Sequence, residues 1–270
     1  MILASDLPLN WWLSLPTAAA YALTALIGPR LALAQGHRLL WAPWALHGLG
    51  LLAVLFAPQE QGVRFGFAPS LSVTVWLMLT FYVLEQHWFP QMRTRWTLAI
   101  LGAAVVVLAA LFPGAPLDVN ASPWLPLHWA LGVASYGLFA AAVVHAWMMR
   151  RAEKNIRQAT DTTEGLPLLT LERLTFRFAG AGFVLLTATL WVGWFFGDSL
   201  YGQVNAWRWD HKTVFSLLSW LVIAILLVGR YRFGWRGRKA VRFLYVGAGL
   251  LLLAYAGSRF VLEVILERSA

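Results

Sequence analysis

The spacing of the charged residues constrains this chain more than any other feature. Long stretches contain no Asp, Glu, Lys or Arg, at residues 7–29, 39–59, 65–84, 96–117, 119–149, 178–197, 213–229 and 243–258. A helix needs about 20 predominantly apolar residues to cross the hydrocarbon core of a bilayer. The stretches have about this length and take up most of the chain. We therefore predict an all-α, polytopic membrane protein with about eight transmembrane helices.

The expected helices lie near residues 10–34, 38–58, 67–88, 95–112, 124–149, 176–198, 213–230 and 241–264. Charged residues make up only 12% of the chain, against roughly 25% in soluble domains, which excludes a soluble enzyme. We expect one transmembrane domain over residues 1–270. Within it, the polar segment 150–175 is expected to be a linker and the Trp-rich segment 199–212 a loop.

The basic residues are distributed unevenly between the two sides of the membrane. Connections between consecutive spans alternate sides, and sixteen of the 21 Lys and Arg residues then fall on one side. Such an excess marks the cytoplasmic side. This predicts a cytoplasmic linker at 150–175, with both termini and the 199–212 loop outside the cytoplasm. The net charge of +9 then reflects the membrane topology. The basic residues are expected to attract anionic membrane lipids rather than a nucleic acid.

Histidine is the residue type here that is best suited to ligate a metal or haem. Of the six histidines, His87 and His145 lie near helix ends, where a polar tip reaches the membrane interface. His47 falls near the bilayer midplane, where ionisable groups usually face protein or a cavity. His128 stands at the outer end of its helix, and His211 lies in the outer loop. Each of these last three is either a hydrogen-bonded packing residue or a ligand.

Two tryptophans in the outer loop are unusual in their surroundings. Trp207 and Trp209 alternate with Arg208, Asp210 and, after one more residue, Lys212. An aromatic belt explains tryptophans at helix ends but fits these two less readily. Aromatic faces beside cationic side chains suit a flat, conjugated ligand that carries carboxylates, such as haem. The chain has no cysteine, no P-loop and no nucleophile elbow, so thiol, phosphate-cradling and serine-hydrolase chemistry have no support.

Several motifs in the chain resemble those of a known family. Residues 207–265 run from WRWDHK through a helix with an internal Trp to GWRGRKA and a Gly-rich apolar segment with the sequence YAG. Residues 127–139, LHWALGVASYGLF, combine a His with a Ser-Tyr pair, and LLTLERLTFR precedes the sixth expected helix. In order and spacing these motifs resemble the CcsA/CcmC-type cytochrome c assembly family of haem-handling membrane proteins, and especially its short eight-helix, YpjD-like inner-membrane branch.

The resemblance implies a haem site at the outer face. It matches His128 to an axial histidine of the family and matches the end of the Trp-rich loop to Trp207, Trp209, Asp210 and Lys212. The candidate iron ligands are His128 and, from the same outer loop, His211, with His47 as a deeper possibility. The chain departs from the pattern in two places. Val228 and Leu266 stand where haem-exporting members have histidines.

These observations predict a CcsA-like protein of the bacterial inner membrane that binds or handles haem at its extracytoplasmic face. It would act in or beside cytochrome c assembly, with membrane lipids and other assembly proteins as partners and without enzymatic activity of its own. One alternative is an accessory subunit that kept the fold and lost haem, which Val228 and Leu266 favour. Another is a transporter, because midplane ionisable groups beside helix breaks are typical of that class, and His47 follows Pro43.

Overall fold

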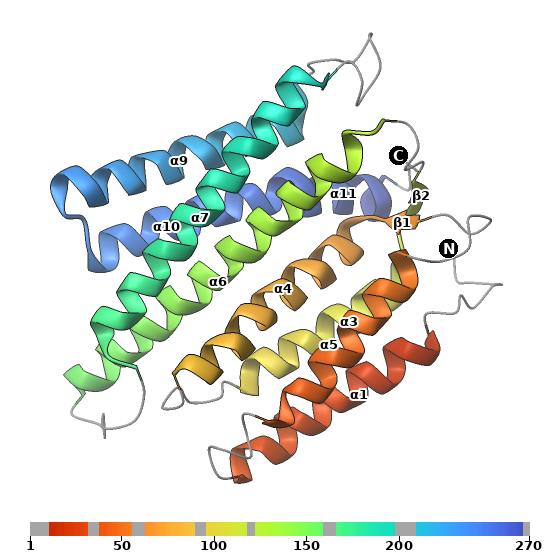
Figure 1. Ribbon diagram of the computed structural model, residues 1–270, viewed down its shortest axis with the longest axis horizontal. Helices are drawn as coiled ribbons and strands as arrows, with labels where there is room; N and C mark the ends of the chain where they lie inside the picture. Colours follow the sequence, from red (N-terminus) through yellow and green to blue (C-terminus); the bar gives the residue numbers. More distant parts are fainter. Residues whose placement is uncertain are drawn as a thin grey trace. The chain divides into compact units, whose positions relative to one another are not determined.

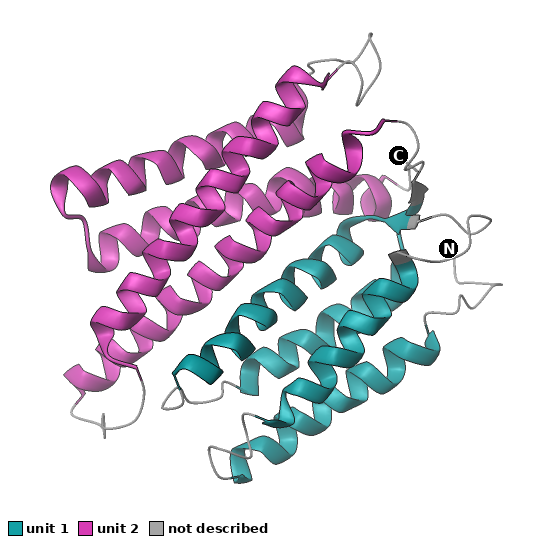
Figure 2. Cartoon of the chain, viewed as in Figure 1, with its two compact units in different colours: residues 1–117 teal, residues 118–270 magenta. Residues whose placement is uncertain are grey.

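The computed structural model describes residues 11–31, 38–55, 63–89, 96–117, 122–158, 166–197 and 209–266. These residues are almost entirely helical, which confirms the predicted all-helical class (Figure 1). The chain forms two compact units, residues 1–117 and residues 118–270, and each is described by itself (Figure 2).

Unit 1 is a bundle of four helices with a small strand pair. The helices are α1 (Trp11–Ile27), α3 (Trp41–Leu55), α4 (Phe67–Trp88) and α5 (Trp96–Leu111), and a short 3-10 helix, η1 (Gly28–Arg30), follows α1. Helix α1 packs against α5 and α3, and α4 packs against the same two helices. Strands β1 (Val63–Phe65) and β2 (Ala115–Leu117) pair antiparallel. This strand pair was not predicted from the sequence.

The strand pair of unit 1 depends on one glycine. Gly114 precedes β2 and has a φ of +79°, a conformation that side chains other than glycine's rarely adopt. A Cβ atom there would also lie 2.6 Å from the backbone of Phe65 in β1. The close approach of the two strands therefore requires glycine at this position.

Unit 2 contains α6 (Leu125–Arg157), α7 (Leu168–Phe195), α9 (His211–Phe233) and a long helical run to Ile265. The run consists of α10 (Gly237–Leu252), a π-helix η3 (Leu253–Gly257), α11 (Ser258–Phe260) and a second π-helix η4 (Val261–Ile265). Helix α6 packs along α7, α9 along α10, and α10 also meets α6. Across the interface of α7 and α9, the Trp220 indole donates a hydrogen bond of 2.9 Å to the Thr187 hydroxyl.

In unit 2, the helices extend into polar segments that were predicted to be a linker and a loop. Helix α6 continues to Arg157 and α7 begins at Leu168, so both ends of the expected linker 150–175 are helical. Charged residues end an apolar stretch, but Arg, Lys and Glu are good helix formers and need not end a helix. Helix α9 likewise begins at His211, inside the expected loop 199–212.

The sequence GWRGRKA forms the tight turn between α9 and α10. Gly234 caps α9 with a φ of +64° and Gly237 has a φ of +57°. The Trp235 N–H donates to the Gly229 carbonyl, 3.1 Å away, which closes the end of α9. A carboxylate also holds this turn, because Glu172 of α7 lies 2.6 Å from Arg230 and 3.4 Å from Arg236.

The lengths and surfaces of these helices identify a multi-pass membrane protein. Among the described residues, five helices are long and apolar enough to span a bilayer: Phe67–Trp88, Leu125–Arg157, Leu168–Phe195, His211–Phe233 and the run Gly237–Ile265. Shorter apolar helices cover Trp41–Val54 and Trp96–Leu111. Large apolar side chains are exposed in the middle of the long helices, as Val184 is at 64%. Apolar surface of this kind is expected to face lipid.

Candidate functional site

One end of unit 2 brings together side chains from all of its long helices. Helix α6 begins at this end and places His128 in its first turn, where the residue is only 8% exposed. Helix α7 passes beside the imidazole ring. The backbone of Thr189 hydrogen-bonds to the ring, and a Cβ atom on Gly193 would lie 3.4 Å from the His128 Cε1 atom. The backbone of α7 at Gly193 therefore lies close to the imidazole, and a methyl group there would make an ordinary van der Waals contact with it.

Two cationic side chains lie near one aromatic ring at the same end of unit 2. Lys212, in the first turn of α9, interacts electrostatically with His128. Its Nζ atom lies 5.8 Å from the ring centroid of Tyr255, and the Arg259 Cζ atom lies at the same distance from that ring. Arg259 is also 3.9 Å from Glu263, one turn further along the run. The site thus combines a buried imidazole, two cations and an aromatic face.

A tyrosine hydroxyl explains the π-helix that carries Tyr255. The Tyr136 hydroxyl donates a hydrogen bond of 2.6 Å to the Leu251 carbonyl and accepts one from the backbone N–H of Tyr255. In a regular α-helix, these two backbone groups would bond directly to each other. A side chain inserted into the ladder distorts a helix locally, and η3 begins two residues after Leu251. Tyr136 of α6 thereby positions Tyr255 of the run.

The described residues of the expected outer loop, Trp209 onward, lie at the start of α9. Asp210 is its N-cap, and the carboxylate accepts a hydrogen bond of 2.8 Å from the Thr213 N–H, which gives Asp210 a local structural role. Trp209 is 73% exposed. His211, the first residue of the helix, is also exposed. Trp207 lies outside the described residues. Two residues of the predicted set, His128 and Lys212, are related electrostatically.

His47 lies in unit 1, where both of its ring nitrogens have partners. A hydrogen bond of 3.3 Å joins Nδ1 to the Tyr21 hydroxyl, and one of 2.8 Å joins Nε2 to the Ser72 hydroxyl. The residue is 3% exposed. Ligation of an iron by His47 would therefore have to break one of these bonds. The contacts describe a histidine that ties together α1, α3 and α4.

His145 differs from its expected place at the membrane interface. It is 1% exposed, its Nδ1–H donates a hydrogen bond of 2.7 Å to the Ala141 carbonyl, and its ring stacks on Phe178 of α7 at 5.2 Å. The expectation that His145 extends a polar tip to the surface was therefore wrong. Tertiary packing between α6 and α7 buries it, whereas His87 is exposed as expected.

Four residues at this end of unit 2 are absent from the predicted site: Tyr136, Gly193, Tyr255 and Arg259. A signal for two of them was present, since Tyr136 belongs to the Ser-Tyr pair after His128 and Tyr255 opens the YAG motif. Their hydrogen bond joins two motifs that lie more than one hundred residues apart. In the described part of the chain, no three His, Cys, Asp or Glu side chains form a group that could hold a metal ion. A single imidazole is sufficient to ligate haem iron.

Comparison with known proteins identifies the family. The model of the family described as "Cytochrome C assembly protein" matches residues 39–266. The chain belongs to this family. It is 34% identical over 225 residues to the inner membrane protein YpjD of Escherichia coli K12, covering 81% of this chain and 83% of YpjD. It is 27% identical over 231 residues to the cytochrome c biogenesis protein CcsA of Thermosynechococcus vestitus, covering 80% of this chain and 63% of that CcsA. No solved structure matches.

Proposed function

We propose that this cytochrome c assembly protein binds haem at the His128 end of unit 2 and handles it on the extracytoplasmic side of the bacterial inner membrane. The observation that carries the proposal is the buried imidazole of His128 at the same end of unit 2 as Lys212, whose side chain lies with that of Arg259 near the Tyr255 ring. Similarity to a cytochrome c biogenesis protein supports the same conclusion. Lipids and other assembly proteins would be the partners.

The residues at this end fit the chemistry of haem. A neutral imidazole binds haem iron without adding a charge to the membrane, and His128 would provide it. Lys212 and Arg259 would pair with the two carboxylates of the ligand, while Tyr255 offers an aromatic face. Haem would supply an iron centre that an imidazole can ligate. His211 lies next to Lys212 in the sequence and would be the candidate for a second iron ligand.

The chain would bind and pass on haem without being an enzyme. Thioether attachment of haem joins it to cysteine thiols, and this chain contains no cysteine, so the thiols would belong to a separate cytochrome. The contribution of the residues described above would be to hold the ligand and to keep water from a buried imidazole.

A second candidate function is that of an accessory subunit that does not bind haem. It is favoured by Val228 and Leu266, at positions where haem-exporting members of the family have histidines. Both side chains are apolar and at least half exposed, at 55% and 50%. Under this alternative, the same fold would assemble with another membrane protein and His128 would be a packing residue.

The absorption spectrum of the purified protein tests the two functions against each other. We expect the full-length protein from haem-replete cells, or apoprotein titrated with haemin, to show a Soret band at one haem per chain. Extraction of the pigment and a pyridine haemochrome assay would confirm its identity. Absence of a band under both conditions would eliminate the haem proposal and leave the accessory subunit.

The proposed topology has about eight spans, with both termini and the 199–212 segment outside the cytoplasm. It follows from the distribution of basic residues, since an excess of Lys and Arg is retained on the cytoplasmic side. Alkaline phosphatase fused after residue 270 or within 199–212 should be active, and fused within 159–165 it should be inactive. Green fluorescent protein at the same sites should give the opposite pattern. An inactive phosphatase at residue 270 would place the His128 end on the wrong side for this function.

A further inference from the structure

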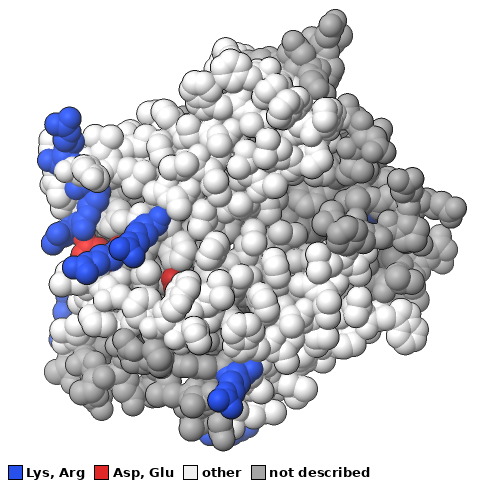
Figure 3. Space-filling view, viewed as in Figure 1, with Lys and Arg blue, Asp and Glu red and all other residues white. Residues whose placement is uncertain are grey.

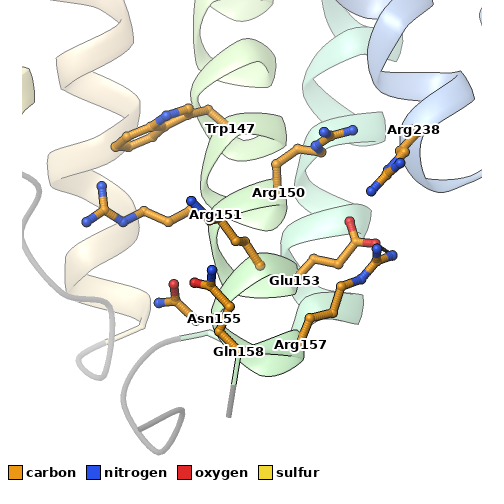
Figure 4. A pocket seen from close by; sticks show the side chains of 9 residues that line it. Trp147, Arg150, Arg151, Glu153, Asn155, Arg157, Gln158 and Arg238 are labelled. Carbon is orange, nitrogen blue, oxygen red and sulfur yellow. Dashed lines mark hydrogen bonds and ion pairs between the residues drawn. The ribbon is translucent and has the colours of Figure 1, made fainter. Parts of the chain in front are cut away.

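A basic pocket lies at the opposite end of unit 2 from His128. It has a volume of about 570 Å³ and is formed by the last turns of α6 and the start of α10 (Figure 4). Its lining residues are Trp147, Arg150, Arg151, Glu153, Lys154, Asn155, Arg157, Gln158 and Arg238. The volume is typical of a site for a small organic ligand.

The pocket carries a strong excess of positive charge. Five of its lining residues are Arg or Lys, and Glu153 is the one acid among them. Glu153 already forms an ion pair of 2.5 Å with Arg157 in the adjacent turn. Arg150 from α6 and Arg238 from α10 point toward each other across the pocket (Figure 4). Like charges that converge from two helices repel each other, and an anion between them would remove this repulsion.

The position of the pocket along α6 matches the headgroup layer of a membrane. Trp147 forms its wall nearest the apolar part of the helix, and tryptophan prefers the level of the lipid headgroups. Arg151 lies over the Trp147 ring at 5.8 Å, and the other cations follow within three turns. Lys and Arg gather at this end of unit 2 (Figure 3). In a spanning helix, cations at such a position are expected at the level of the lipid phosphates.

We propose that this pocket binds the phosphate headgroup of an anionic phospholipid, and that a headgroup with two phosphates fits it best. Arginine binds phosphate through paired hydrogen bonds, and basic pockets between transmembrane helices suit such headgroups. Arg150 and Arg238 would hold one phosphate, and Arg151 with Lys154 the second. A lone phosphate ion would fill only a small part of the volume. The proposal does not depend on haem binding.

The experiment measures lipid binding to the full-length protein by native mass spectrometry. Cardiolipin, which has two phosphates, is compared with phosphatidylglycerol, phosphatidylcholine and inorganic phosphate. We expect cardiolipin to bind tightest and phosphatidylcholine not to bind. Arg150→Gln with Arg238→Gln should weaken cardiolipin binding by about tenfold or more, because each charged hydrogen bond to phosphate contributes substantially. Glu153→Gln should tighten it, a gain that misfolding cannot produce.

The matched control removes the same charge from the same end of the unit. Arg173 and Arg177 on α7 are exposed and do not line the pocket, so Arg173→Gln with Arg177→Gln should change cardiolipin affinity less than about twofold. Equal weakening in both double variants would show that only the net charge attracts lipid and would overturn the site. If inorganic phosphate bound as tightly as cardiolipin, with the same dependence on Arg150 and Arg238, the pocket would be a site for free phosphate. The lipid proposal would then be overturned.

Discussion

Replacing His128 by alanine should remove the Soret band of the haem-loaded protein or shift it strongly. The imidazole lies in a buried position beside Gly193, and its loss would leave the iron without the main ligand that the chain offers. The expected loss is most of the bound haem per folded protein, measured by the pyridine haemochrome assay and by absorption. Exogenous imidazole should restore absorbance if the surrounding pocket survives.

The same helix provides a control for this variant. His145 is also buried, but it lies 17 residues further along α6, which corresponds to about 26 Å at the rise of an α-helix. His145→Ala should therefore retain haem at the level of the unmodified protein. His211→Ala should convert a six-coordinate spectrum into a five-coordinate one. If His128→Ala bound haem with an unchanged spectrum, His128 would be a packing residue and the ligand would lie elsewhere.

The sequence predicted the helices well where hydropathy alone decides them. The expected helix at 67–88 and helix α4 have the same bounds, and α5 differs from its expected range by one residue at each end. At 150–175 the helices extend into both ends of the expected linker, because charge shows where the apolar core of the membrane ends but not where a helix ends. Arg150 to Arg157 continue the helix and supply the walls of the basic pocket.

The geometry of the candidate site could not be predicted from the sequence, because it depends on contacts between distant segments. His128 could be selected from its position in the sequence, and Lys212 from its loop. No local pattern could show that the Tyr136 hydroxyl separates the Leu251 carbonyl from the Tyr255 N–H. The same applies to His47, whose partners are Tyr21 and Ser72 on two other helices. Such partners are visible only after the bundle has formed.

Glu172→Gln should destabilise the protein more than any other single charge removal at the basic end of unit 2. The Glu172 carboxylate is 12% exposed and lies 2.6 Å from the Arg230 guanidinium, whose side chain is 23% exposed. Glutamine keeps the shape but leaves the Arg230 charge without a counterion in a partly buried position, which costs about 3 kcal/mol. For a chain of this size, the midpoint of thermal unfolding in detergent should fall by about 6–12 °C.

Glu153→Gln provides the comparison, because it is the same substitution at the same end of the unit. Glu153 pairs with Arg157 on one helix face, with side chains 30% and 60% exposed. Pairs of this kind contribute about 0–1 kcal/mol, so its midpoint should change by no more than about 4 °C. The two variants should differ because the arginines that lose their partners have different surroundings. Water solvates Arg157 after its partner is lost, whereas Arg230 lies against the Phe176 ring at 4.6 Å and also donates to the Trp235 carbonyl in the turn. Equal shifts for the two variants would mean that Glu172 does not hold the α9–α10 turn to α7.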